Sequence, residues 1–211
     1  PRSDELVCTE EISGDYSAAC ACVHGLPVSC NSMTVVPLGA DTIETWRTGC
    51  VFFPPFIGPA VTGDVRTRNP GTNAFLNPQN PDPNSDFMTF SADGTASGCF
   101  KKRPGSQKRA FQKVETRDLA GKWRGLSCNP FVPCWPFSIV FCTTKKALNE
   151  DQYEELGCYC CLGLPQRVSE TRTRKYVNGH ATNGFDDGSD IHWHRDPGCA
   201  GKNMFFAKKV G

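Results

Sequence analysis

The sequence predicts a mainly β fold built from two related small antiparallel units that disulfide bonds staple together. Three observations predict it: short stretches in which side chains alternate, a pattern of signatures that occurs twice, and 13 cysteines in 211 residues. Only residues 144–156 favour a helix, so we expect one short helix near that position. Units of this size bury a limited core and often need covalent staples.

The internal duplication rests on four signatures that occur in the same order in both halves. The first joins Trp46 and Cys50 in one half to Trp123 and Cys128 in the other. The second is an Arg-Thr-Arg segment before Thr-Asn-x-Phe, at 66–75 and 172–185. The third is an Asp-apolar pair, at 86–87 and 190–191. The fourth is a turn that leads to a Cys and a basic end, at 93–102 and 196–209. We therefore expect Trp46 and Trp123 to be structural residues at equivalent places.

The signatures divide the chain into four parts. We expect a Cys-rich N-terminal segment at 1–32, a first β repeat at 33–102, a basic linker at 103–116, and a second β repeat at 117–211 that carries a helical and Cys-rich insertion. The N-terminal segment has poor apolar periodicity, which indicates a loop-rich flap.

In the first repeat, residues 33–36 and 43–51 have the alternation of strands. The prolines at 54, 55 and 59 indicate that residues 52–59 are not a central strand, because proline lacks a backbone donor. Residues 69–86 read as a long loop, followed by a strand at 87–90 and a tight turn at Asp93-Gly94.

In the second repeat, the Trp strand is expected at 119–126. Residues 144–156 contain good helix formers, with Thr144 as a cap and Gly157 as the stop. Further strands are expected at 168–177, 180–185, 191–195 and 203–210, and Asn178-Gly179 favours a hairpin turn.

The cysteines predict an oxidising compartment, an organelle lumen or the exterior of the cell. Structural zinc is the alternative, but the chain has no Cys-x-x-Cys. We expect Cys50 to pair with Cys99 and Cys128 with Cys199, while the odd count leaves at least one thiol over.

Few residues form a chemical motif. His192 and His194 share one face of a strand and form a weak candidate for a metal site, with His180 or Asp190 as a third ligand; two polar residues on an open face are the simpler interpretation. Residues 186–190 indicate a hairpin loop rather than a calcium site, and Cys158, Cys160 and Cys161 a structural cluster. No nucleophile or phosphate-binding motif occurs, so we predict no catalytic residue and no cofactor, and the sequence favours a non-enzyme without excluding an enzyme. Pigment or lipid binding is kept as an alternative.

Charge and hydropathy exclude two classes of partner. The net charge is +1 with both signs interspersed, so we expect no nucleic-acid surface, and no apolar stretch is long enough for a transmembrane helix. The start at Pro1-Arg2-Ser3 suggests a processed chain.

The aromatic-proline segments are the strongest candidates for an interaction surface. Large rings lie among prolines that prevent regular pairing, and exposed rings of this kind mark interfaces. The candidate docking residues are Phe52, Phe53, Phe56, Phe131, Trp135 and Phe137. Packing of these rings onto their own sheets is the alternative.

Two stretches carry family resemblances. The segment Asp118-Leu119-Ala120-Gly121-Lys122-Trp123 resembles the Gly-x-Trp first strand of lipocalins, and the stretch from Cys99 to Cys134 is similar to the lumenal violaxanthin de-epoxidases. This resemblance implies a thylakoid lumen and a photosynthetic setting.

Three hypotheses about function remain open. The first is a non-enzymatic interaction protein, such as a peripheral lumenal accessory subunit that docks onto a larger assembly of an algal photosynthetic membrane. The second is a lipocalin-like protein that binds a carotenoid or lipid, and the third is a redox enzyme of the de-epoxidase type.

Overall fold

The computed structural model describes residues 6–18, 21–23, 26–28, 31–53, 56–78, 87–97, 100–127, 139–161, 164–202 and 205–210. The fold is mainly β, as the sequence predicted. The chain divides into two compact units, one made of residues 1–49 and 64–112 and the other of residues 50–63 and 113–211.

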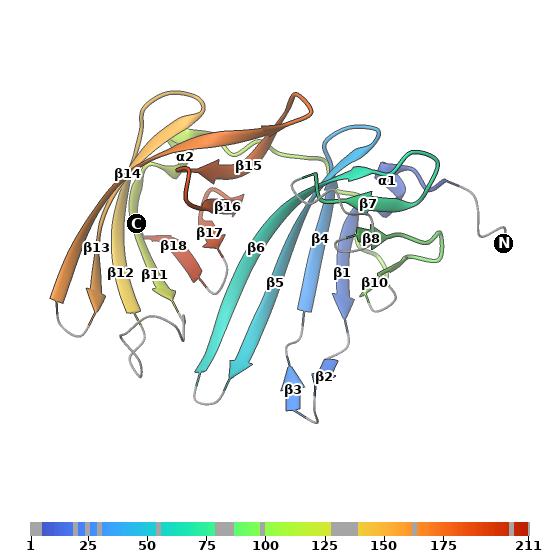
Figure 1. Cartoon of the computed structure of the whole chain (residues 1–211), viewed down its shortest axis with the longest axis horizontal. Helices are drawn as coiled ribbons and strands as arrows, with labels where there is room; N and C mark the ends of the chain where they lie inside the picture. The colour runs from blue at the N-terminus through green and yellow to red at the C-terminus, as the bar shows by residue number, and fades with distance from the viewer. Residues whose placement is uncertain are drawn as a thin grey trace. The chain divides into compact units, whose positions relative to one another are not determined.

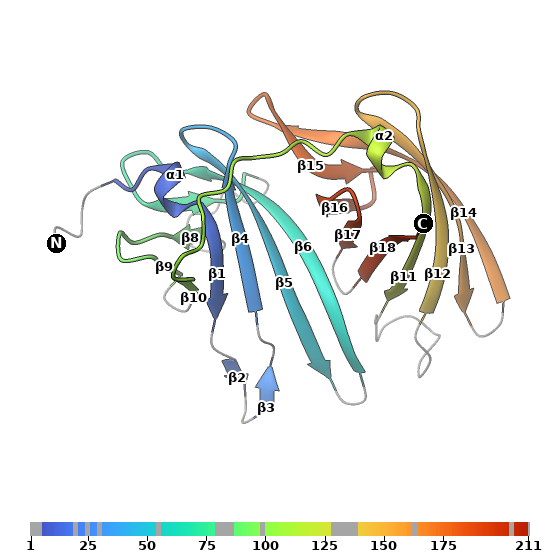
Figure 2. The same cartoon turned by 180° about the vertical axis from the view of Figure 1, so that it is seen from behind.

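The second unit contains a closed barrel of eight strands (Figures 1 and 2). Each strand pairs antiparallel with the next along the chain, and the last pairs with the first. A four-residue helix, α2 (Thr116–Leu119), precedes the barrel. The strands are β11 (Gly121–Ser127), β12 (Ile139–Ala147), β13 (Gln152–Cys161), β14 (Leu164–Val177), β15 (His180–Asp186), β16 (Ile191–Asp196), β17 (Cys199–Lys202) and β18 (Phe205–Val210).

The sheet of the first unit has the same order of elements, and the part of its β5 and β6 strands within residues 50–63 is the segment counted with the second unit. The helix α1 (Thr9–Ile12) precedes an eight-stranded antiparallel sheet in the order β8-β7-β6-β5-β4-β1-β10-β9. A bridge between Phe90, which follows β8, and Ala96 of β9 joins the two ends, so this sheet is also barrel-like. The strands are β1 (Gly14–Ala18), β4 (Asn31–Pro37), β5 (Thr42–Phe53), β6 (Phe56–Arg68), β7 (Ala74–Leu76), β8 (Phe87–Thr89), β9 (Thr95–Ala96) and β10 (Phe100–Lys102); the hairpin of β2 (Ala21–Val23) and β3 (Leu26–Val28) lies between β1 and β4.

The first strands of the two units anchor an aromatic residue in the same way. The Tyr16 hydroxyl in β1 donates to the Ile12 carbonyl of α1 at 2.7 Å. In β11, Nε1 of Trp123 donates to the Leu119 carbonyl of α2 at 2.8 Å. Tyr16 and Trp123, both fully buried, are therefore the equivalent pair of aromatic residues.

A second shared device ties the segment before each helix to the sheet. In the first unit Arg68 donates to the Val7 carbonyl at 2.7 Å, pairs with Asp41 at 3.0 Å and covers the Phe75 ring at 4.6 Å, while Asn73 accepts from the Val7 N–H at 2.8 Å. The second unit repeats every contact. Arg174 donates to the Val114 carbonyl at 2.6 Å, pairs with Asp151 at 2.8 Å and covers the Phe185 ring at 4.5 Å. Asn183 accepts from the Val114 N–H at 2.9 Å. These matches show that the fold is duplicated, and they place the Arg-Thr-Arg and Thr-Asn-x-Phe signatures at equivalent positions.

Glycine is required at the start of each first strand. Gly14 has a φ of +140° and Gly121 a φ of +131°, which L side chains rarely adopt. A Cβ on Gly14 would lie 2.9 Å from Cε of Lys102, and one on Gly121 would lie 3.0 Å from Cε of Lys209. The two lysines donate to equivalent carbonyls, Glu11 and Asp118, so each unit closes with the same lysine.

The expected equivalence of Trp46 and Trp123 is wrong. Trp46 lies in β5, the third strand of its sheet, where Nε1 donates to Glu44 at 3.0 Å, whereas Trp123 lies in a first strand. Counting from the matching hairpins Leu38–Thr42 and Leu148–Gln152, the residue equivalent to Trp46 is Leu156. The Trp-Arg dipeptide occurs in both halves of the sequence, but in strands that are not equivalent.

The expected helix at 144–156 is also wrong, because β12 and β13 form a hairpin there. The Leu148 N–H donates to the Gln152 carbonyl at 2.9 Å, and Oδ1 of Asn149 accepts from the Asp151 N–H at 2.9 Å. Long-range pairing of both strands within the barrel overrides the helix propensity of the segment.

The N-terminal segment is more regular than expected. It contains α1 and β1, and β1 lies between β4 and β10. Tyr16 and Ile12 belong to the core of the first unit, so this segment contributes core residues although its sequence shows no regular spacing of apolar residues.

Disulfide stapling finds no support in the described residues. Cys8, Cys142, Cys158 and Cys199 are free thiols. Because Cys199 is a free thiol, the expected pairing of Cys128 with Cys199 is not formed. Cys99 and Cys128 lie outside the described residues, and Cys50 lies in β5.

The remaining strand predictions of the second repeat agree with β11, β14, β15, β16 and β18 to within a few residues, and Asn178-Gly179 forms the turn between β14 and β15. Residues 187–190 form a loop in which Asp187 accepts three hydrogen bonds from Ser189 and Asp190.

Within the described part of the chain, no helix is long and apolar enough to span a bilayer.

Candidate functional site

The interior of the second barrel differs from that of the first at matched positions. The apolar residues Met33, Val35, Met88 and Phe90 belong to the core of the first unit. Their counterparts, from the matching hairpins and strand registers, are the buried residues Thr143, Lys145, His192 and His194. Other core positions keep their apolar character, such as Ile12 and Leu119 or Phe75 and Phe185. The two interiors therefore share a fold but differ in polarity at these four positions.

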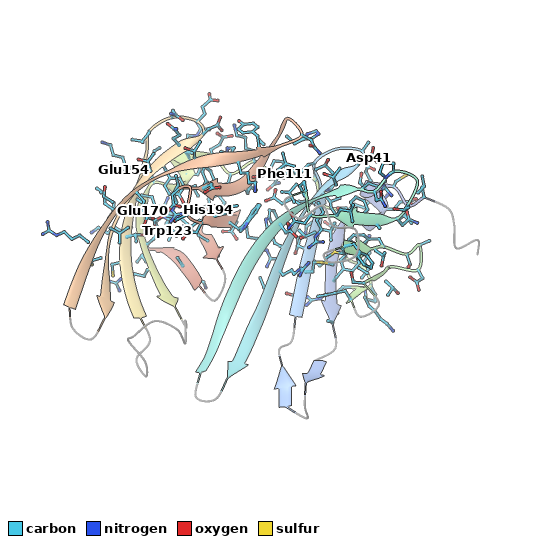
Figure 3. All side chains as sticks on the ribbon, viewed as in Figure 1. Asp41, Phe111, Trp123, Glu154, Glu170 and His194 are labelled. Carbon is cyan, nitrogen blue, oxygen red and sulfur yellow. The ribbon has the colours of Figure 1, made fainter. Side chains whose placement is uncertain are left out.

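Three polar atoms meet at the centre of the second barrel. Nζ of Lys145 lies 3.4 Å from Oη of Tyr153 and 3.4 Å from Nε2 of His194, and these last two atoms are also 3.4 Å apart. Each distance is at the long end of the hydrogen-bond range, so the contacts are loose. Figure 3 shows His194 beside Trp123, and Nζ of Lys145 lies 4.3 Å from the centre of the Trp123 ring.

His194 is held by aromatic rings on three sides. Its imidazole meets the rings of Trp123, Tyr153 and Phe185 edge to face, at centroid distances of 5.6, 5.9 and 5.4 Å. The side chain is fully buried, and Nδ1 has no hydrogen-bond partner among the described residues. A buried nitrogen without a partner is costly, so this orientation needs another reason.

A charged group lies next to this triangle of atoms. Nε of Arg172 lies 3.3 Å from Oε2 of Glu155, and Nδ1 of His192 lies 3.4 Å from the same oxygen. Arg172 also pairs with Glu170, Asp187 and Asp190, at 2.6, 3.0 and 2.7 Å. We call Lys145, Tyr153, Glu155, Arg172, His192 and His194 the polar cluster.

Burial sets the protonation of the polar cluster. Desolvation lowers the pKa of Lys145 to about 8, although Glu155 opposes this shift. Desolvation also lowers the pKa of His192 to about 4 and that of His194 well below its ordinary value, and it raises the pKa of Tyr153. Burial works to raise the pKa of Glu155, but Lys145 and His192 hold it well below its usual range. At neutral pH the cluster thus combines a cationic lysine, neutral histidines and a protonated tyrosine.

Small residues line the wall beside His194. The strand register runs from His194 to Ala200, then to Ala207 and Gly125, all of them buried. An eight-stranded barrel has an interior that side chains fill or that holds one small ligand. Small side chains on one wall and convergent polar atoms on the other are typical of a ligand site.

The two histidines singled out from the sequence do share a face, and that face is the barrel interior rather than an open surface. They do not meet a common partner: His192 lies near Glu155 and, at 3.7 Å, Asp190, whereas His194 faces Lys145 and Tyr153. Among the residues that the structure describes, no group of three His, Cys, Asp or Glu side chains could hold a metal ion together.

The aromatic-proline residues lie apart from this cluster in the sequence. Phe52 and Phe53 end β5 and Phe56 begins β6, so the backbone there is strand, where the prolines had predicted an extended loop or the edge of a sheet. Phe131, Trp135 and Phe137 lie outside the described residues. Their role in docking stays a prediction.

Sequence reasoning missed Lys145, Tyr153, Glu155 and Arg172. Three of them were assigned to a helix, which hid the alternation by which Thr143 and Lys145 point inward while Cys142 and Thr144 point outward. The usable signal was the mismatch of the repeats, since a duplicated core that changes from apolar to ionisable residues marks a place where function differs.

Comparisons with known proteins give no further guide. The chain matches no protein-family model, no curated protein and no solved structure.

Proposed function

We propose that the second barrel binds a small, largely apolar molecule by an oxygen-bearing end group, in the manner of a lipocalin-like carotenoid or lipid binder. The observation that carries the proposal is the polar cluster at positions where the first unit has Val35, Met88 and Phe90. Buried ionisable groups destabilise a fold unless they are well paired. Arg172 has a buried counterpart in Arg66 of the first unit, but Lys145, His192 and His194 replace apolar residues, and this difference between two equivalent cores favours a function in the second.

The end group is inferred from the donors. The Lys145 ammonium and the Tyr153 hydroxyl both donate, and both pack at 3.4 Å around His194. A carboxylate or carbonyl oxygen at this point would accept from Lys145 and Tyr153 through shorter hydrogen bonds than the two donors make with His194. The apolar body is inferred from the rings of Trp123 and Phe185 and from the small wall of Ala200 and Ala207.

A titration with three retinoids tests the proposal, because retinoic acid, retinal and retinol carry a carboxylate, an aldehyde and a hydroxyl on one apolar body. Quenching of tryptophan fluorescence reports binding, and loss of this quenching in Trp123→Phe assigns it to Trp123 rather than to the other three tryptophans. We expect at least one retinoid to bind, and Lys145→Met to weaken that binding by about 10- to 100-fold, which is the loss of one hydrogen bond to a charged group. Lys146→Met is the matched control, since Lys146 points outward from the same strand.

Two outcomes overturn the proposal: no retinoid binds the unmodified protein, or Lys145→Met and Lys146→Met bind with the same affinity. Chemical analysis of the recovered ligand separates a binder from an enzyme. An unchanged molecule agrees with binding alone, whereas a converted one contradicts it and favours the enzyme hypothesis. A lumenal accessory role in a photosynthetic membrane assembly remains a separate hypothesis, which rests on the faint family resemblance and on the aromatic-proline segments.

A further inference from the structure

The outer wall of the second barrel carries two cysteines directly opposite each other. Cys142 of β12 is the register partner of Cys158 of β13. Cys142 is exposed, Cys158 is partly exposed, and both are free thiols. Direct partners on neighbouring strands point to the same face, so both thiols lie on the outside of the barrel, opposite to the polar cluster.

The Cα spacing of this pair lies within the range for a disulfide, while its Cβ atoms start slightly too far apart. The Leu148 N–H donates to Gln152 at 2.9 Å, and in an antiparallel ladder every second pair from there is hydrogen-bonded, which includes Cys142–Cys158. Such pairs have Cα atoms about 5.5 Å apart, in the middle of the range for disulfides. Gly157 keeps the strands close at this level, because a Cβ there would lie 2.5 Å from Cγ2 of Thr143.

Arginines flank the two thiols on both sides. Arg124 of β11 is the register partner of Cys142, and Arg167 of β14 is the partner of Cys158. Both arginines are exposed, so the row from Arg124 to Arg167 presents two cations with the thiols between them. Positive charge at an exposed site attracts anionic reagents and raises their rate of association.

We propose that Cys142 and Cys158 form a reversible cross-strand disulfide by exchange with an anionic small-molecule disulfide of the glutathione type. The more exposed Cys142 attacks one sulfur of glutathione disulfide as a thiolate, forms a mixed disulfide and releases one glutathione. Cys158 then attacks the Cys142 sulfur and releases the second glutathione. The two protein thiols lose two electrons and two protons, and the glutathione disulfide gains them as two thiols.

The bond forms on an exposed, hydrogen-bonded pair whose Cβ atoms must draw slightly together. Exposed or strained disulfides are the ones that reductants open most readily. The same two strands carry Lys145 and Glu155 on their inner face, so the bond ties together the strands that hold part of the polar cluster.

The test is to reduce the full chain, expose it to glutathione disulfide, block the remaining thiols with N-ethylmaleimide and map the linked peptides by tandem mass spectrometry. We expect a bond from Cys142 to Cys158 that excess reduced glutathione opens, and that is lost in Cys142→Ser and Cys158→Ser but kept in Cys199→Ser. Cys142 linked to Cys160 or Cys161, both thiols left free for the maleimide, or a bond that glutathione does not open would overturn the proposal.

A rate measurement tests the arginines. Arg124→Gln combined with Arg167→Gln should slow bond formation by glutathione disulfide several-fold more than by the neutral hydroxyethyl disulfide. Equal slowing with both reagents would contradict recognition of an anionic disulfide.

Discussion

Replacing His194 with phenylalanine should stabilise the second unit while it removes part of the proposed ligand site. The first unit already contains this arrangement: Phe90 meets the rings of Tyr16 and Phe75 edge to face at 5.9 and 5.5 Å, and His194 meets Trp123 and Phe185 at 5.6 and 5.4 Å. Phenylalanine therefore fits the space and keeps the ring contacts.

The expected change in the free energy of unfolding follows from the hydrogen bonds that His194→Phe removes. The substitution removes a buried Nδ1 without a partner, which relieves about 1–3 kcal/mol, and gives up two contacts of Nε2 at 3.4 Å, which are worth up to about 1 kcal/mol together. We expect a net gain of about 1–2 kcal/mol, seen as a rise in Tm of about 4–8 °C per kcal/mol for a unit of roughly 100 residues.

Scanning calorimetry or urea unfolding measures this gain, and the reverse substitution Phe90→His in the first unit is the control. It puts two nitrogens among apolar side chains and should destabilise that unit by about 2–4 kcal/mol. If His194→Phe destabilises by more than about 1 kcal/mol while retinoid binding is unchanged, His194 is a structural residue and the reasoning about a functional interior fails.

Three further predictions concern stability and docking. Burial lowers the pKa of His192 to about 4, against 6.5 for the unfolded chain, so the unfolded state takes up a proton first as the pH falls. The free energy of unfolding should therefore fall by up to about 3 kcal/mol between pH 6.5 and pH 4. In urea titrations, His192→Met should make this dependence on pH less steep. Asn73→Ala and Asn183→Ala should each cost about 1–3 kcal/mol in chemical unfolding, because each leaves an equivalent backbone N–H, of Val7 or Val114, without its acceptor; a large difference between them would contradict the duplication. Replacing Phe53 and Trp135 with Ser, singly and together, should abolish co-purification with a partner at unchanged thermal stability if these rings dock, and a loss of stability alone would show that they are core.

Much of the fold was predictable because its signals are local. The Asn178-Gly179 turn, the Arg-Thr-Arg strand and the Thr-Asn-x-Phe segment reflect turn chemistry and alternation, which short windows of sequence carry. The first half of each repeat was not predictable in this way, since Tyr16 and Trp123 share a role but not an identity, while Trp46 shares an identity with Trp123 but not a role.

The site was predictable only in its histidines. Their spacing placed His192 and His194 on one face, but which face is buried depends on the closure of the barrel, a long-range property. Lys145 and Glu155 were hidden because an alternating strand of lysine, threonine and glutamate also reads as a good helix, and only pairing with neighbouring strands decides between the two.

If the polar cluster in the second barrel is a ligand site, a ligand must bind to the chain only while the cluster is intact. Native mass spectrometry of the unmodified chain, of Lys145→Met combined with His194→Phe, and of Lys146→Met, each titrated with the three retinoids, tests it most directly. We expect a single bound molecule on the unmodified chain and on Lys146→Met, and none on a folded double variant. Equal occupancy of all three proteins, or no occupancy of the unmodified chain, would contradict it.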